Sequence, residues 1–399
     1  MTGLQAPGSR LRASVPGVGP LVRNPKPEVP DHLSIEARRD LDLGLEDAVA
    51  LEALVATRPY VGVFLSPAWL AGFLAEPPDG SEPLLLLMRE GGTLRGMVPI
   101  AVRRTLTHVR VSLLGGGAGS DRVDLLAARG YEAPCADLFL SWLADSFGRG
   151  SVLELQDVPG SSPLWAAIHR AGIERRHRLV LVPREIHPVP YLDLLEPGSR
   201  PSGEVTRGST SLARHRRWLE QRCRLRIERL RDPGEVMSAF ETLVRFLCVR
   251  WRGHGGSALD DPRAERFHRR VLPLLLAEGR LRMIQLSADM RPIAVYYGLG
   301  LGTWAGYYLA GYDREWAGRI HLGQITLATA MDLAAQDGAT EFDFLKGAER
   351  TKYLWRVRER ATVNADVYSA QAGPQALRAI RAVRDAAVAL AKTARLLAI

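Results

Sequence analysis

The sequence contains little lysine, little cysteine and no long apolar run. Lysine supplies only four of its 53 basic side chains, at Lys26, Lys346, Lys352 and Lys392. Its three cysteines are too few and too scattered for a disulfide framework or a zinc site, which is typical of a reducing compartment. No stretch of 18 apolar residues and no signal-peptide core is present, so we expect a cytoplasmic protein.

Several enzyme signatures are also missing. There is no GxSxG elbow, no HExxH motif and no cysteine with an evident histidine partner, and the nine histidines are scattered. We therefore predict neither a metal site nor covalent catalysis by serine or cysteine. What is present is ordinary for a soluble globular chain, with 46% apolar and 24% charged residues over 399 positions, enough for two domains. The net charge of +9 permits phosphate, nucleic-acid or anionic-membrane partners without choosing among them.

The most informative pattern spans residues 304–355. An aromatic and apolar run at 307–311 is typical of a buried strand, and apolar residues at helical spacing follow over 322–333. Gly338 ends this helix as a C-terminal cap, and Phe342–Leu345 forms a second strand. The order of elements predicts a βαβ crossover, in which the free amides at the start of the helix point out of the loop.

An internal repeat predicts two copies of one α/β unit. The hairpin pattern of residues 84–104 recurs at 281–302, and each hairpin is followed by a helix, a glycine and a strand. We expect the glycine-rich stretch LGGGAGSDRVDLL of the first copy to form a tight turn. The predicted division is a disordered tail at 1–30, a first domain at 31–195, a linker at 196–207, a second domain at 208–370 and a basic amphipathic helix at 371–399.

Two basic helical segments leave alternatives open. Residues 207–231 carry nine arginines against two glutamates, which fits either contact with RNA or phosphate or a solvated face. The helix at 373–399 has apolar residues at spacings of three and four among basic ones. Its apolar face fits contact with the protein, a partner or a membrane surface.

The order RPIAVYYG, YYLAGYD, HLG and FDFLKGAERTKYLW resembles the CelD-like acyltransferases of the GNAT superfamily, which are akin to the FemAB-type peptidyltransferases. The resemblance is strong over 205–365 and weaker over 60–195. It implies an α/β fold of two tandem GNAT-like (acyl-CoA N-acyltransferase) domains, each a mixed twisted sheet flanked by helices. Chemistry is expected in the second domain, with the first shaping the acceptor site.

The same resemblance implies transfer of an acyl group from acetyl-CoA or another acyl-CoA to an amine or hydroxyl. The acceptor would be a small molecule or a glycan precursor, loosely in polysaccharide or envelope metabolism. FemAB-type relatives use aminoacyl-tRNA instead, so tRNA-dependent transfer is one alternative. A non-catalytic RNA- or partner-binding protein on a degenerate GNAT scaffold is another, in which the arginines of 207–231 would carry the binding.

The donor site is expected where the second-copy helix begins. Leu309 and Ala310 would contact the thioester through backbone groups, and the pyrophosphate would lie on the amides of His321, Leu322, Gly323 and Gln324. GNAT pyrophosphate loops usually carry two close glycines, whereas this segment offers only Gly323.

Candidate acids and bases are Asp343, Asp313 and Glu349, with Tyr312 as a proton donor to the leaving thiolate. Asp343 is the first choice because it lies on the strand face opposite Phe342 and Phe344. A carboxylate there is either functional or paired with a structural partner such as Lys352. Candidate groups for the acceptor or a phosphate are Arg250, Trp251, Lys346, Arg350 and Lys352.

Overall fold

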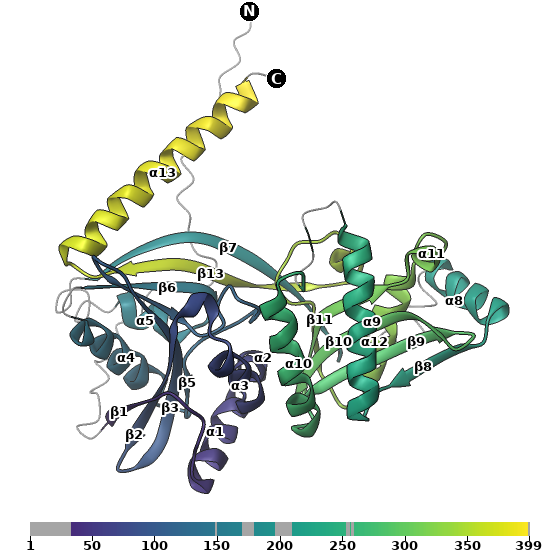
Figure 1. The fold of residues 1–399 in the computed structure, drawn as a ribbon, viewed down its shortest axis with the longest axis horizontal. Helices are drawn as coiled ribbons and strands as arrows, with labels where there is room; N and C mark the ends of the chain where they lie inside the picture. The colour runs from purple at the N-terminus through teal and green to yellow at the C-terminus, as the bar shows by residue number, and fades with distance from the viewer. Residues whose placement is uncertain are drawn as a thin grey trace, which may run out of the picture.

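We describe the chain from a computed structural model, which covers residues 33–147, 150–169, 179–195, 210–252, 256 and 259–397. The predicted tail at 1–30 and linker at 196–207 lie outside these residues. The described strands form one 13-stranded mixed sheet in the order β1-β2-β3-β4-β6-β13-β7-β12-β11-β10-β9-β8, and β5 pairs with β3. Figure 1 shows this sheet running through two lobes that correspond to the two halves of the chain.

The first lobe is built from elements before residue 195. Its strands are β1 (Leu33–Arg38), β2 (Glu82–Glu90), β3 (Thr93–Arg104), β4 (Val109–Leu113), β5 (Leu126–Ala127), β6 (Ser151–Pro159) and β7 (Val180–Asp193). Its helices are α1 (Leu45–Thr57), α2 (Pro59–Gly62), α3 (Pro67–Ala75), α4 (Glu132–Ser146) and α5 (Pro163–His169), with 3₁₀ turns at Val63–Leu65 and Pro78–Gly80.

The second lobe follows residue 210. Its strands are β8 (Leu225–Arg229), β9 (Leu281–Ala288), β10 (Arg291–Leu301), β11 (Trp304–Tyr312) and β12 (Glu341–Asp343). Its helices are α8 (Thr210–Arg222), α9 (Pro233–Trp251), α10 (Pro262–Ala277), α11 (Arg314–Ala317) and α12 (Leu322–Gln336). A 3₁₀ turn at Lys352–Leu354, the strand β13 (Arg358–Tyr368) and the helix α13 (Ala372–Leu397) complete the chain.

Local sequence fixes where the main helices begin. Ser66 accepts a hydrogen bond from the amide of Trp69 and precedes a proline at the first position of α3. Asp232 and Asp261 cap α9 and α10 in the same way, each again followed by proline. Such side chains satisfy amides that have no partner inside the helix, so the start of each helix is specified by its own residues.

The two lobes are joined through strands rather than only through side chains. β13 follows the second lobe in sequence, yet it pairs antiparallel with both β6 and β7 of the first lobe. β7 in turn pairs with β12 of the second lobe. In Figure 1, β7 and β13 form the long twisted ribbon that passes from one lobe to the other. A rigid sheet therefore connects the first lobe to the elements that follow β11.

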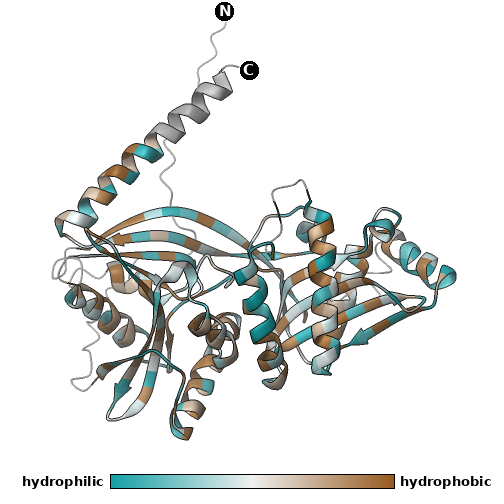
Figure 2. Cartoon of the chain, in the orientation of Figure 1, coloured by the Kyte–Doolittle hydropathy of each residue, from teal (hydrophilic) through white to brown (hydrophobic). Residues whose placement is uncertain are grey.

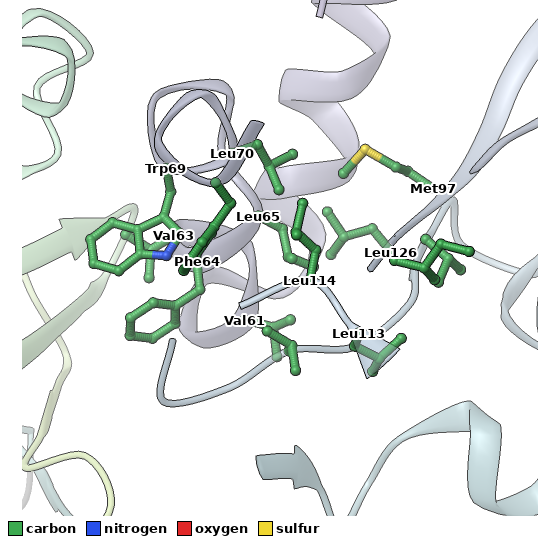
Figure 3. Close-up of a cluster of buried hydrophobic side chains, with 14 of the residues drawn as sticks. Val61, Val63, Phe64, Leu65, Trp69, Leu70, Met97, Leu113, Leu114 and Leu126 are labelled. Carbon is green, nitrogen blue, oxygen red and sulfur yellow. The ribbon is translucent and has the colours of Figure 1, made fainter. Parts of the chain in front are cut away.

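Alternating side chains on the sheet build two cores. In the second lobe, Val295 and Tyr297 face the core under α9 and α10, whereas Ala294 and Tyr296 face the core under α12. Figure 2 shows by its colouring that apolar residues recur along these strands and on the helices over them. In the first lobe, Figure 3 shows Phe64, Trp69 and their neighbours packed between helical turns and strands.

The predicted βαβ crossover is present, because β11 and β12 are parallel and α12 connects them. The second strand is shorter than predicted: it ends at Asp343, not at Leu345. Leu345 has a positive φ of 59°, and its amide donates to the Asp343 carboxylate at 2.8 Å. The chain therefore turns away from β11 directly after Asp343.

Candidate active site

A cavity opens where β11 and β12 part. The two strands pair only from Trp304 opposite Glu341 to Gly306 opposite Asp343. β11 continues to Tyr312, whereas β12 stops. The edge of β11 beyond Gly306 therefore faces a cavity of about 850 Å³ instead of a neighbouring strand. Unpaired strand-edge groups of this kind can accept an extended ligand.

A β-bulge shapes the wall of this cavity. The register of β10 and β11 shifts so that Tyr297 opposes Leu309 and Gly298 opposes Tyr307, which leaves Tyr308 as an extra residue. A bulge re-aims the side chains around it. Tyr308 is one of the residues that line the cavity, and its hydroxyl donates to the backbone carbonyl of Gly119 at 2.7 Å. The bulge thereby ties the β11 wall to the glycine-rich turn of the first lobe.

The N-terminus of α12 forms the opposite wall. His321 precedes the helix without a side-chain cap, and the first turn holds no acidic residue. A Cβ added at Gly323 would lie 3.3 Å from the ring of Tyr312, so the helix backbone comes close to β11 here. Among the residues that the structure describes, no acceptor faces the Gly323 amide. The positive end of the helix dipole is thus available to an anionic group in the cavity.

All predicted donor-site residues line this cavity. They are Leu309 and Ala310 on β11 and His321, Leu322, Gly323 and Gln324 at the start of α12. The structure brings the two groups to facing walls, because the crossover from β11 to β12 passes through α12. Their roles in binding a donor remain proposals.

Four of the five predicted substrate-binding residues also line the cavity: Arg250, Trp251, Lys346 and Lys352, whereas Arg350 is not among its lining residues. The Arg250 guanidinium lies 5.3 Å from the Trp251 ring centre and 5.9 Å from that of Tyr312. Lys346 pairs with Asp157 at 2.8 Å. Arg250 is therefore the cation placed over the aromatic wall, while the Lys346 ammonium is held by the first lobe.

Lys352 has a structural position. Its side chain is nearly buried, and its ammonium donates to the Lys346 carbonyl at 2.8 Å and pairs with Glu349 at the same distance. These contacts fix the loop that follows β12. The alternative in which Lys352 is the structural partner of Asp343 is not what the structure has: Arg122 holds that position.

Asp343 lies outside the cavity lining and is fully buried. Both of its oxygens face the Arg122 guanidinium, at 2.7 and 2.8 Å. Burial alone would raise the pKa of Asp343, but the Arg122 charge and its hydrogen bonds outweigh this and lower the pKa. An ionised, doubly paired carboxylate is a poor proton acceptor, so this geometry argues against Asp343 as the base.

The other predicted acids and bases also divide into residues that line the cavity and residues that do not. Asp313 caps the short helix α11 by accepting from the amides of Glu315 and Trp316, and it does not line the cavity. Tyr312 and Glu349 do line it. Glu349 is engaged by Lys352 on the outer side of the loop. Tyr312 is thus the predicted catalytic residue most directly placed on the donor walls.

Asp121 is the carboxylate that sequence reasoning missed. It lines the cavity from the first lobe, and its Oδ2 accepts the backbone amide of Lys346 at 2.8 Å. Burial raises the pKa of Asp121, although the Lys346 amide and the Arg122 charge oppose the shift. A carboxylate with a raised pKa in a cleft suits proton transfer near neutral pH. The available signal was its position directly after Gly115, Gly117 and Gly119, whose positive φ angles shape the turn.

Two tyrosines on β11 form a donor pair. Tyr307 and Tyr312 both line the cavity, and the two phenols lie near enough for each to influence the pKa of the other. Burial raises the pKa of each phenol, so both stay protonated at neutral pH. Protonated phenols can donate to a developing negative charge.

Two further structural findings concern ions and membranes. Within the described ranges, no group of three or more histidine, cysteine, aspartate or glutamate side chains is placed to hold a metal ion. No single helix among the same residues is long and apolar enough to cross a membrane. Leu45–Thr57 and Pro59–Ala75 reach that length and composition only as a pair bent by 118°.

Comparison with known proteins identifies the fold. Residues 206–353 match the Acetyltransferase (GNAT) domain. No curated protein sequence matches the chain. Among solved structures, FemX is similar with a TM-score of 0.57 at 10% identity, covering 86% of this chain and 99% of FemX.

Two further solved structures are similar as well. The C-terminal domain (DUF2156) of a putative lysylphosphatidylglycerol synthetase from Agrobacterium fabrum gives a TM-score of 0.51 at 12% identity, covering 85% of this chain and 95% of that one. L-PGS from Bacillus licheniformis gives 0.50 at 11% identity, with coverages of 86% and 98%. At these identities the likeness concerns the fold. The predicted GNAT-type fold class is confirmed, and the match to the GNAT domain lies in the second half of the chain.

Proposed function

We propose that this protein transfers an acyl group from an acyl-CoA thioester, such as acetyl-CoA, to an amine or hydroxyl acceptor. The observation that carries the proposal is the early end of β12. It exposes the edge of β11 at Leu309 and Ala310 in the same cavity as the uncapped start of α12. An extended pantetheine arm can pair with such an edge while the CoA pyrophosphate lies at the start of the helix, on the Gly323 amide.

The acceptor would reach the thioester from the side of the first lobe. Asp121 lies there, with its carboxyl group held by the Lys346 amide and its pKa raised by burial. In the proposed reaction Asp121 takes the proton of the attacking amine or hydroxyl, a bond forms to the carbonyl carbon, and the carbon–sulfur bond breaks. Tyr312 donates its proton, or a hydrogen bond, to the leaving thiolate.

The proposed base, Asp121, lies in the first lobe, whereas the sequence-based choice lies in the second. Asp343, the sequence-based choice, is paired with Arg122 and supports the turn after β12. Glu349 stays a cavity carboxylate engaged by Lys352. The resemblance to CelD-like acyltransferases supports a glycan-precursor acceptor in envelope or polysaccharide metabolism as the finer form of the proposal.

A second candidate donor is aminoacyl-tRNA. The observation that favours it is the basic helix α8 beside the cavity. His215 of α8 accepts the backbone amide of His321 at 3.3 Å, and Arg214 and Arg217 are exposed on the same helix. A polyanion entering at His321 would pass along these arginines.

Release of free CoA thiol, measured with purified protein, a panel of acyl-CoAs and a panel of amines and sugars, tests the proposal. Acceptor-dependent thiol release that falls at least about a hundredfold in Asp121→Asn supports it. Thiol release that is unchanged in this variant removes Asp121 as the base. Aminoacyl transfer from charged tRNA, with no use of any acyl-CoA, would identify aminoacyl-tRNA as the donor.

A further inference from the structure

Among the described residues, the contacts that anchor the helix α13 to the body lie near its start. Pro374 is buried, and a Cβ on Gly373 would lie 2.1 Å from the carbonyl oxygen of Thr107. The guanidinium of Arg381 pairs with Glu154 at 2.7 Å and with Asp366 at 2.8 Å. These contacts fix the direction in which the helix leaves the first lobe.

Beyond this anchor the helix carries uncovered apolar side chains. Ile380 is 66% exposed and Val383 is 71% exposed. Figure 1 shows α13 running away from the two lobes, and Figure 2 shows apolar and polar residues alternating around its described turns. A helix of 26 residues is about 39 Å long, and an isolated amphipathic helix is only marginally stable in water. A covering surface is therefore expected for this face.

Apolar and basic side chains are exposed on different sides of α13 over the part whose side chains are described, which ends at residue 386. At about 100° per residue, the midpoint of Ile380 and Val383 lies roughly 130° around the helix from that of Arg378 and Arg384. Over its whole length the sequence of the helix contains five basic residues. The helix has one acidic residue, Asp385.

The distribution of charge on α13 indicates what kind of surface covers its apolar face. Two copies of α13 packed through Ile380 and Val383 would set side by side two helices that each carry five basic residues and one acidic residue, and this net positive charge disfavours self-pairing. An anionic bilayer offers apolar acyl chains beneath negative headgroups, which matches the apolar and basic sides of the helix. We propose that α13 binds the surface of an anionic lipid bilayer and lies in the plane of the interface.

Co-sedimentation of the full chain with vesicles tests this proposal. The vesicles are phosphatidylcholine alone or phosphatidylcholine mixed with phosphatidylglycerol. We expect binding to the anionic vesicles that weakens as salt is raised, and little binding to the neutral ones. The double variant Ile380→Asp, Val383→Asp is expected to bind anionic vesicles at least about tenfold more weakly, because it puts two carboxylates on the apolar face.

A matched control places the same charges on exposed apolar residues elsewhere. Val49 on α1 and Met290 in the β9–β10 turn are 63% and 70% exposed, so Val49→Asp, Met290→Asp changes the net charge equally. We expect this control to bind like the wild type. The charge-reversal variant Arg378→Glu, Arg384→Glu should lose binding even though its apolar face is intact.

Two results would overturn the proposal. One is wild-type protein that does not sediment with anionic vesicles, while its unfolding midpoint shows that it is folded. The other is a wild-type dimer in light scattering that the Ile380→Asp, Val383→Asp variant dissociates, with vesicle binding equal in both proteins. The second result would assign the apolar face of α13 to another copy of the chain.

Discussion

The carboxylate of Asp121 accepts the backbone amide of Lys346 at 2.8 Å, across 225 residues of sequence. This contact places a first-lobe carboxyl group inside a cavity whose other walls come from β11 and α12. The Lys346 ammonium reaches back and pairs with Asp157 of the first lobe. The cavity is therefore complete only when both lobes are present.

Asp121→Asn should lower kcat/KM by about two to four orders of magnitude, because an amide cannot accept the acceptor's proton. In the wild type, activity should fall as the pH drops through the raised pKa of Asp121, since the base must be ionised. Steady-state rates across pH measure both effects. Glu349→Gln, at a second cavity carboxylate, is the matched control. A larger loss in Glu349→Gln than in Asp121→Asn would exchange their roles.

Asp343→Asn should destabilise the protein by about 3–5 kcal/mol, because it leaves the buried Arg122 guanidinium without its counter-charge. The lowered pKa of Asp343 contributes stability above the ordinary aspartate value of 3.8, and this stability is lost as the pH falls. Urea unfolding at neutral pH measures the difference.

The control for that measurement is Glu220→Gln, which removes the exposed pair of Glu220 with Arg216 on α8. A surface pair contributes roughly 0–1 kcal/mol, so little change is expected. Equal effects of the two variants would contradict the structural role given to Asp343.

Tyr308→Phe should lower kcat/KM by about tenfold while leaving the unfolding free energy within about 2 kcal/mol, through loss of two hydrogen bonds. One of them joins the Tyr308 hydroxyl to the His268 imidazole at 3.4 Å. The other is donated to the carbonyl of Gly119, two residues before Asp121. Because it positions the turn that carries the base, the pH profile should change in Tyr308→Phe. A variant with wild-type rate and pH dependence would show that the turn holds its shape without it.

His268 should make the protein sensitive to acid. It is fully buried against Tyr297 and Tyr308, and burial lowers its pKa from 6.5 to about 3. Since the unfolded chain binds this proton below about pH 6.5 and the folded chain does not, stability should fall as the pH drops from 6.5 towards 3. In His268→Gln, the slope of the unfolding free energy against pH over this range should be smaller than in the wild type, by an amount that corresponds to up to one proton. An unchanged slope would mean that the histidine protonates in the folded state.

The β11 and α12 walls of the cavity could be predicted from sequence because they lie in one continuous segment. The apolar period, the glycine cap and the second strand place β11, α12 and β12 together without knowledge of the rest of the chain. Leu309, Ala310 and Gly323 consequently reached the cavity as expected. The confirmed GNAT-type fold followed from the same segment and from its resemblance to known acyltransferases.

The carboxylates were harder to predict because their environments depend on contacts between the lobes. Alternation correctly placed Asp343 opposite Phe342 and Phe344, but its partner Arg122 lies 221 residues away. Asp121 follows a glycine turn whose shape is local, while its proximity to Lys346 depends on how β7 and β13 join the lobes. The alternation of residues along a strand predicts which face of the sheet a side chain lies on, whereas the partner that this side chain contacts is set by the tertiary structure.

The most direct measurement of the central claim is calorimetric titration of the protein with acetyl-CoA and longer acyl-CoAs, compared with Gly323→Asp. That variant places a carboxylate at the proposed phosphate site beside Tyr312. Gly44→Asp is the matched control, because Gly44 is the open N-cap of α1, far from the cavity lining. The account predicts saturable binding that Gly323→Asp loses and Gly44→Asp keeps. Absence of binding to every thioester by the folded wild type would contradict it.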